Sequence, residues 1–293
     1  MEDWTNKVKF KHTTCRNKNG ERYSLENNQI SLYVVLTRKC NTQCKFCEFR
    51  EGKSNINTEL FNRRLEELRE VSDIGTIHFT GGEPTLEIEK LKTLCKIIKK
   101  QDSSIITSVN TNGTKLKELE NIEELDNIAL SRHSISDEEN KEVFGSSLVP
   151  SADYIKNFKD KEKIHLSCNL IRGYIDSSEK IIQYLEFAAS LGINDIGLVS
   201  LMKVNKYCSD KFIDFSNIEL PNKDKLIKTR CYSNISETTK KECCRCENYL
   251  YRASNLKLVS MYHRYAIKNT EIADYLVYED NHIKQGFSGE III

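Results

Sequence analysis

Three cysteines lie close together early in the chain, at Cys40, Cys44 and Cys47. Thiolates are soft ligands that suit iron–sulfur clusters or zinc, so this spacing predicts a metal centre. A closed structural zinc site takes four ligands, whereas three cysteines on a cubane 4Fe-4S cluster leave one iron with an open position. The count therefore favours a cluster whose open iron binds a substrate or cofactor, with a zinc fragment as the alternative.

A glycine-rich turn is the second candidate, formed by Gly81, Gly82, Glu83 and Pro84. Two glycines let the backbone approach a ligand closely, and Glu83 offers an anionic hydrogen-bond acceptor. Such a loop can hold the ammonium group of an amino acid. Taken alone, the four residues fit an ordinary turn before a helix equally well. Their place one strand after the cysteines favours a ligand-binding loop.

A second group of cysteines lies late in the chain, with four of them within sixteen residues. Thiols stay reduced in the cytosol, where structural disulfides are rare, and the segment around this group lacks the apolar periodicity to fold by packing alone. A second 4Fe-4S cluster or a zinc ion is therefore expected to stabilise it. The preferred ligands are Cys231, Cys243 and Cys246, with Cys208 fourth and Cys244 competing for that place.

Strand-like and helix-like segments alternate from residue 31 onward. A helix is expected to begin after Asn57, a good N-cap, and another to open with the capping pattern Asp176 to Glu179 and close at Gly192. The alternation predicts a parallel sheet with right-handed crossovers. Six strands are expected, at 31–36, 75–80, 104–110, 127–131, 164–171 and 195–201.

Six such units fit an α/β fold of the open, partial (β/α)6 TIM-like barrel kind better than a closed eight-unit barrel. The barrel is expected over residues 31–202, after an N-terminal extension at 1–30 and before a small cysteine-rich region at 203–293. Parallel barrels place their active sites at the carboxyl ends of the strands, where both motif loops stand. Cys95 and Cys168 lie in apolar patterns and are expected to be small core residues.

Composition and charge limit the classes of partner that this protein is expected to bind. The 293 residues include 44 basic and 43 acidic side chains, for a formal net charge of +1. No electrostatic footprint favours nucleic acid or a membrane surface. No apolar stretch long enough for a transmembrane span and no signal peptide is recognisable. We therefore expect a cytoplasmic protein whose partner is a small molecule or a short peptide.

The cysteine motif and the glycine-rich loop together resemble the radical S-adenosylmethionine (SAM) superfamily, and the resemblance extends over about residues 28–202. It implies that the three cysteines hold a 4Fe-4S cluster and that the loop holds the methionyl amine of SAM. In that family, an aromatic residue near the third cysteine and several strand ends surround the adenine, ribose and methionine of SAM. The residues that match these positions are Phe46, Thr111, Asn112, Ser131, Asn169 and Ile171.

Later motifs are similar to the molybdenum-cofactor cyclase branch and the related SPASM/Twitch enzymes, which carry a second cluster after the barrel. Two departures speak against cyclase activity on GTP: the spacing of the second cysteine group, and a terminus of isoleucines, 291–293, in place of a Gly-Gly tail. Where the fourth strand of that branch runs into Asp, this chain has Arg132 and His133. We expect both to face the central cavity as substrate contacts, with surface positions as the alternative, and His133 is also a candidate proton acceptor.

The resemblance implies an enzyme that cleaves SAM at the first cluster and uses the 5′-deoxyadenosyl radical to abstract a hydrogen atom from its substrate. A second cluster would favour an oxidative outcome, such as dehydrogenation or cross-linking. A flavodoxin- or ferredoxin-type protein is the electron donor that such chemistry implies. The rival interpretation is a non-catalytic iron–sulfur or zinc protein that senses redox state or binds a partner.

Overall fold

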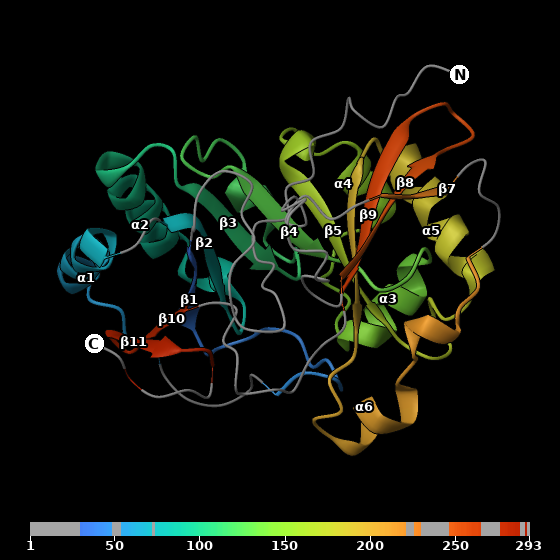
Figure 1. The fold of residues 1–293 in the computed structure, drawn as a ribbon, viewed down its shortest axis with the longest axis horizontal. Coiled ribbons are helices and arrows are strands. Elements are labelled where there is room, and N and C mark those ends of the chain that lie inside the picture. Colours follow the sequence, from blue (N-terminus) through green and yellow to red (C-terminus); the bar gives the residue numbers. More distant parts are fainter. Residues whose placement is uncertain are drawn as a thin grey trace, which may run out of the picture.

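A computed structural model describes residues 30–48, 54–71, 74–220, 226–229, 246–264, 276–287 and 291. Within these ranges the strands form one eleven-stranded sheet, in the order β11-β10-β1-β2-β3-β4-β5-β6-β9-β8-β7. Strands β1 to β6 pair in parallel with their neighbours in chain order. The helices lie on the outside of the sheet (Figure 1). The α/β partial-barrel fold expected from the sequence is thereby confirmed.

The six central strands agree with the predicted ones to within two residues at each end. The strands could be predicted from their alternating or continuous apolar residues, because one face of each strand packs on the helices. The strands are β1 (Ile30–Thr37), β2 (Ile74–Gly81), β3 (Ile106–Thr111), β4 (Asn127–Ser131), β5 (Ile164–Leu170) and β6 (Asp195–Ser200).

The helices follow the strands as crossovers. Four short 3-10 turns accompany them: η2 (Pro84–Glu87), η3 (Leu116–Leu119), η4 (Lys161–Lys163) and η5 (Phe215–Asn217). The α-helices are α1 (Thr58–Val71), α2 (Ile88–Gln101), α3 (Asp137–Phe144), α4 (Ala152–Lys156), α5 (Ser178–Leu191) and α6 (Lys206–Lys211).

The predicted helix caps are confirmed in two places and shifted in a third. Asn57 caps α1, since its Oδ1 accepts from the Leu60 N–H at 2.9 Å, and Gly192 ends α5 in the left-handed region at φ 84°. The N-cap of α5 is Ser177, one residue later than the start of the predicted pattern. Asp176 does not cap the helix because its carboxylate accepts from the Gly173 N–H at 2.7 Å.

The strands after residue 202 extend the barrel sheet at both of its edges. β9 pairs in parallel with β6, and β10 pairs in parallel with β1. The boundary between a barrel at 31–202 and a region at 203–293 stays a prediction, because strands from both sides of it share one sheet. The strands of this part are β7 (Leu226–Thr229), β8 (Cys246–Arg252), β9 (Leu258–Arg264), β10 (Leu276–Glu279) and β11 (His282–Gln285).

The core lies between the sheet and its helices. Cys95 on α2 and Cys168 on β5 are both fully buried in it, as expected for small apolar residues. Burial raises the pKa of the Cys95 thiol to about 12, so neither its surroundings nor its charge state suggest reactivity. Among the helices that the structure describes, none is long and apolar enough to cross a membrane.

Candidate active site

The loop after β1 carries the first three cysteines at the carboxyl ends of the parallel strands. Thr42 Oγ1 lies 3.3 Å from Cys40 Sγ and 3.5 Å from Cys44 Sγ, so these two thiols flank one hydroxyl. Burial raises the pKa of Cys44 to about 11, and the neighbouring Cys47 and Cys40 add to the rise. A bound metal reverses this effect, because coordination deprotonates a thiol outright.

The donor set of this loop fits a cluster better than a single ion. In the part of the chain that the structure describes, no three His, Cys, Asp or Glu side chains gather in a way that would bind one metal ion. In a cubane cluster each cysteine binds a different iron, so the three thiols need not converge on one point. Cys40, Cys44 and Cys47 are therefore suited to hold a 4Fe-4S cluster.

The glycine pair after β2 packs against the backbone of the cysteine loop. A Cβ on Gly82 would lie 2.1 Å from the Lys39 carbonyl oxygen, and one on Gly81 would lie 2.1 Å from that of Thr37. The N–H groups of Gly82 and Glu83 donate to the Thr37 and Lys39 carbonyls, both at 2.8 Å. The close approach that the sequence predicted is thus made, in this structure, to the neighbouring loop.

The carboxylate of Glu83 is buried and accepts four hydrogen bonds. Oε1 accepts from the Thr85 N–H, the Thr85 hydroxyl and the Thr111 hydroxyl, at 3.0, 2.6 and 2.7 Å. Oε2 accepts from the Asn112 N–H at 2.7 Å. Burial raises the pKa of Glu83, and these donors oppose the rise. With about four acceptor positions in total, this carboxylate mainly ties the glycine loop to the end of β3, and a direct contact with an ammonium group stays a prediction.

Asn112 extends the same network to the cysteine loop. Its Oδ1 accepts from the Thr114 N–H at 2.9 Å, and its Nδ2 donates to Asn41 Oδ1 at 3.0 Å and lies 3.9 Å from Cys40 Sγ. The loops at 38–48, 81–84 and 111–114 are therefore locked together; we call them the loop corner. The structure brings together the cysteines, the glycine pair, Glu83, Thr111 and Asn112, as the sequence predicted.

An aromatic group borders the loop corner on the side of β4 and β5. The ring of His133 contacts Phe46 edge-on, with centroids 5.1 Å apart, and stacks on Phe144 at 4.9 Å. Ile171 is fully buried in a cluster that Phe46 packs against. The predicted adenine neighbours Phe46 and Ile171 are thus close in space, within one apolar cluster.

His133 is held as a neutral ring. Its Nδ1 accepts from the Asn169 backbone N–H at 3.0 Å, which places the ring proton on Nε2. Burial, with a smaller contribution from the charge of Arg132, lowers the pKa of His133 to about 3. At neutral pH the ring is therefore a hydrogen-bond donor, which corrects the expectation that His133 accepts a proton.

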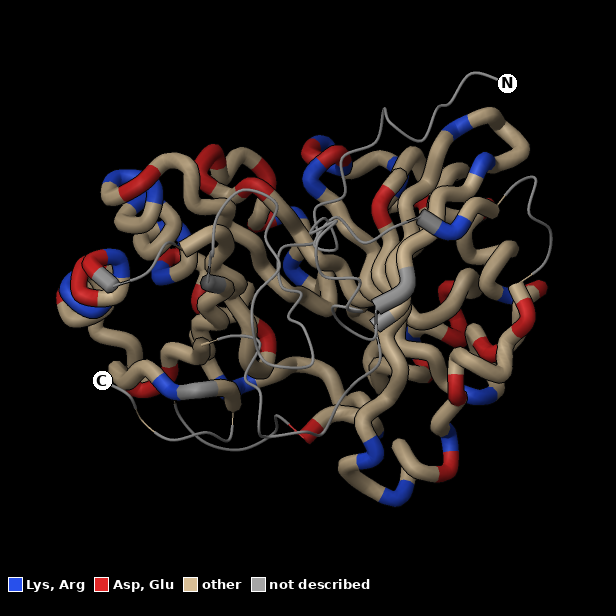
Figure 2. Tube along the Cα trace, in the orientation of Figure 1, with Lys and Arg blue, Asp and Glu red and all other residues tan. Residues whose placement is uncertain are grey.

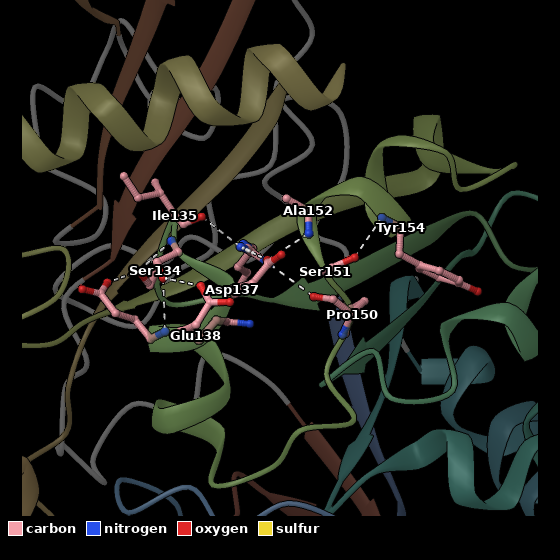
Figure 3. Close-up of polar contacts among 12 residues, drawn as sticks. Ser134, Ile135, Asp137, Glu138, Pro150, Ser151, Ala152 and Tyr154 are labelled. Carbon is pink, nitrogen blue, oxygen red and sulfur yellow. Dashed lines mark hydrogen bonds and ion pairs between the residues drawn. The ribbon is translucent and has the colours of Figure 1, made fainter.

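Arg132 points away from the side on which Ser131 and His133 lie. Its guanidinium donates to Asp137 Oδ1 at 2.7 Å and to the carbonyls of Ile135 and Pro150 at 3.0 and 3.2 Å, a network that Figure 3 shows around the starts of α3 and α4. The predicted substrate contact is corrected for a simple reason. Alternate residues of a strand face opposite sides, and Arg132 takes the helix side.

Cys208 lies against the first cysteine loop. Asn205 caps α6 by accepting from the Cys208 N–H at 2.8 Å, and its Nδ2 donates to the Lys45 carbonyl at 3.2 Å. The buried Cys208 thiol lies 3.5 Å from the Phe46 carbonyl. The other predicted ligands of a second metal lie outside the described residues: Cys231, Cys243, Cys244 and the side chain of Cys246.

One contact that supports the cysteine loop was not predicted from the sequence. The Phe144 carbonyl at the end of α3 accepts from the Gln43 N–H at 2.8 Å, and Gly145 ends the helix at φ 58°, where a Cβ would lie 3.3 Å from Gln43. Gly145 was a readable helix stop. Its partner 102 residues upstream in the chain was not readable, because nothing local in the sequence links the two segments.

Comparisons with known proteins agree with this geometry. A family model described as the radical SAM superfamily matches residues 34–188. A probable GTP 3′,8-cyclase of Saccharolobus islandicus is 31% identical over 182 residues, which cover 59% of this chain and 57% of the relative. One of Sulfolobus acidocaldarius is 28% identical over 231 residues, covering 71% and 72%. The chain thus spans less than two thirds of the length of the first of these relatives.

Solved structures share the fold. Streptococcus suis SuiB bound to S-adenosylmethionine has a TM-score of 0.51 at 18% identity, covering 66% of this chain and 44% of SuiB. SuiB bound to its precursor peptide SuiA gives a TM-score of 0.51 at 19% identity, covering 61% and 41%. At this level of identity the likeness concerns the fold alone.

Proposed function

This chain belongs to the radical SAM superfamily, and we propose that it abstracts a hydrogen atom from a small molecule or short peptide with an oxidative outcome. The observation that carries the proposal is the loop corner. There the cysteine loop, the glycine loop and the loop after β3 are tied to one another by backbone and carboxylate hydrogen bonds. A cluster-binding loop and a cofactor-binding loop fixed in one geometry are what positioning a reactive cofactor requires.

Some of these residues are proposed to bind the cluster and others to bind SAM. Cys40, Cys44 and Cys47 hold the 4Fe-4S cluster, which supplies the electron that cleaves SAM to a 5′-deoxyadenosyl radical. Phe46 and Ile171 offer apolar contact to the adenine. The carbonyls of the glycine loop hold the methionyl ammonium. Further cofactor contacts are proposed for Gly81 to Pro84, Thr111, Asn112, Ser131 and Asn169.

A second cluster is proposed for the late cysteine group. Cys246 begins β8 and pairs with Arg264, which pairs in turn with Val199 near the end of β6. This register supports a second cluster at the same carboxyl edge of the sheet as the first, where it would accept an electron from a substrate radical. Cys231, Cys243 and Cys246 remain the preferred ligands. The contact of Cys208 with the first cysteine loop favours Cys244 for the fourth place.

The substrate is not fixed by the relatives. Their printed names give GTP 3′,8-cyclase activity, and a fold neighbour binds a precursor peptide. The different spacing of the late cysteines speaks against the cyclase reaction here. A flavodoxin- or ferredoxin-type protein is proposed as the electron donor that reduces the first cluster. The exposure of Cys40, a proposed ligand of that cluster, supports access for such a donor.

The test is anaerobic reconstitution with iron and sulfide, followed by incubation with SAM and dithionite. Wild-type protein should form 5′-deoxyadenosine, and replacement of all three early cysteines by alanine should remove about four irons and all SAM cleavage. An unchanged iron content in the triple variant would contradict the assignment of these three cysteines as cluster ligands. A protein that binds iron but never cleaves SAM would favour the non-catalytic alternative. Metal analysis of the triple variant then tests the late group, where one zinc and no iron would remove the argument for an oxidative outcome.

A further inference from the structure

The segment around α6 touches the turn that joins the second and third of the early cysteines. Asn205 Nδ2 donates to the Lys45 carbonyl at 3.2 Å, and the Cys208 thiol lies 3.5 Å from the carbonyl of Phe46. Lys45 and Phe46 are the two residues that separate these cysteines in the chain. Both carbonyls of the cysteine turn are therefore contacted by the segment that follows β6, and we call residues 205–212 the α6 bridge.

The other end of the α6 bridge is tied to the loop after β5. The Arg172 N–H donates to the Lys211 carbonyl at 3.0 Å, and the Arg172 guanidinium donates to the Phe212 carbonyl at 3.1 Å. Arg172 directly follows Ile171, a proposed adenine contact. The bridge thus joins the cysteine turn to the loop that is proposed to contact the adenine of SAM.

Apolar side chains of the bridge pack alongside both loops. Tyr207 and Phe212 pack against the buried cluster that contains Ile171. Phe46 of the cysteine turn packs against the same cluster. Close-packed contacts of this kind transmit a displacement from one loop to the other.

Asn205 has two roles that can be separated. Its Oδ1 accepts from the Cys208 N–H at 2.8 Å and so caps α6, whereas its Nδ2 makes the contact with the cysteine turn. Serine is also a preferred N-cap, but it lacks the amide nitrogen. A serine at this position therefore keeps the cap of α6 and removes the contact with the turn.

The exposed side of the α6 bridge carries charges of both signs. Lys206 and Asp210 are exposed, and Lys211 is half-buried. Figure 2 shows blue and red segments mixed along this excursion from the sheet, at the lower right. A surface that attracts a strongly charged partner carries mainly one sign. The contacts of the bridge with the two loops, rather than its exposed side, therefore indicate what it does.

We propose that the α6 bridge fixes the position of the cysteine turn relative to the loop after β5, with Asn205 and Arg172 as the positioning residues at its two ends. This inference rests on the proposed function, because the two loops are the proposed sites of the cluster and of the adenine. A cofactor that contacts both loops binds tightly only when their spacing is already correct. Asn205 and Arg172 thereby contribute to SAM affinity through the loops that they hold.

The test is a double-mutant cycle on reconstituted protein, with SAM binding measured by equilibrium dialysis. Asn205→Ser keeps the cap of α6, and Arg172→Ala keeps the backbone hydrogen bond of that residue. Each should weaken SAM binding about fivefold, with the iron content and the free energy of unfolding of the wild type. Because both act through one segment, the double variant should bind SAM only slightly more weakly than either single variant. Arg172→Lys, which keeps a donor, should restore most of the affinity.

Asn57→Ser is the matched control, because it makes the same change at the N-cap of α1. Its SAM affinity should equal that of the wild type. Three results would overturn the proposal: wild-type SAM affinity in either single bridge variant, independent effects in the double variant, or an equal loss of affinity in Asn57→Ser. Loss of the first cluster's iron in Asn205→Ser would also overturn it, because the bridge would then hold the cluster itself. A wild-type protein that takes up about four irons but does not bind SAM would instead count against the proposed function.

Discussion

Two places on the same sheet are built by different means: the loop corner, and a polar group on β5, β6 and β9 that consists of His165, Asp195 and Tyr262 and that we call the wall triad. In the loop corner, neighbouring backbones touch: Gly82 leaves no space for a Cβ beside the Lys39 carbonyl. In the wall triad, long side chains reach one another across strands, and Gly197 leaves no space beside the end of Tyr262. The corner can change only if a chain segment moves, whereas the triad can change by the rotation of one side chain.

This difference suits the two tasks. A cluster and its cofactor need one fixed geometry, and contacts between backbones provide it with little freedom. A polar wall of the barrel can differ between enzymes that share the cofactor chemistry. Side-chain contacts allow such differences without disturbing the sheet.

Gly82→Ala is expected to have the largest effect. The new methyl group would lie 2.1 Å from the Lys39 carbonyl oxygen, so the cysteine loop must move away from the glycine loop. We expect loss of most of the first cluster's iron and of SAM cleavage, with the fold retained because the strands themselves are untouched. Iron analysis and circular dichroism of the reconstituted variant check this.

Gly197→Ala is its matched control, because the clash there meets the flexible end of Tyr262 rather than a backbone. This variant should keep its iron and its cleavage of SAM. If both alanine variants kept their iron, the contrast between a backbone-built corner and a side-chain-built wall would be wrong.

The sequence predicted the corner far better than the wall, and locality explains why. The cysteine spacing, the glycine pair and the strand ends are short-range patterns, and strand alternation could also have placed Arg132 on the helix side, had it been carried one residue past Ser131. Tyr262 and His165 are 97 residues apart in the chain. Their meeting depends on β9 pairing with β6, which no local pattern in the sequence indicates.

Glu83→Ala tests the role of the buried carboxylate within the corner. Four donors would lose their acceptor, at a cost of about 1.5–3 kcal/mol for each important bond to a charged group. We expect a lower free energy of unfolding and weaker SAM binding, with Glu83→Gln intermediate because an amide keeps one acceptor oxygen. Urea unfolding and equilibrium dialysis with SAM measure the two effects.

Glu89→Gln on α2 is the control for Glu83, because its carboxylate is mostly exposed and forms a surface ion pair with Lys92. It should change neither quantity noticeably. A Glu83→Ala protein that loses stability but binds SAM with wild-type affinity would show that the carboxylate braces the loops without influencing the cofactor.

The smallest expected effect concerns His133, and it appears in the pH dependence of stability. The ordinary pKa of this ring is 6.5, and burial lowers it to about 3 in the folded chain. Between pH 6.5 and about 3 the unfolded chain binds a proton that the folded chain does not. The neutral ring therefore contributes its whole stabilisation above this pH range and loses it progressively as the pH falls through the range.

His133→Gln, which keeps an acceptor for the Asn169 N–H, should therefore reduce the slope of unfolding free energy against pH by up to about 1.4 kcal/mol per pH unit. Urea unfolding of metal-free, reduced protein between about pH 6 and 4 measures the slope, with the exposed His282→Gln as control. An unchanged slope would mean that His133 titrates normally, and that the ring between Phe46 and Phe144 is not held as a neutral donor.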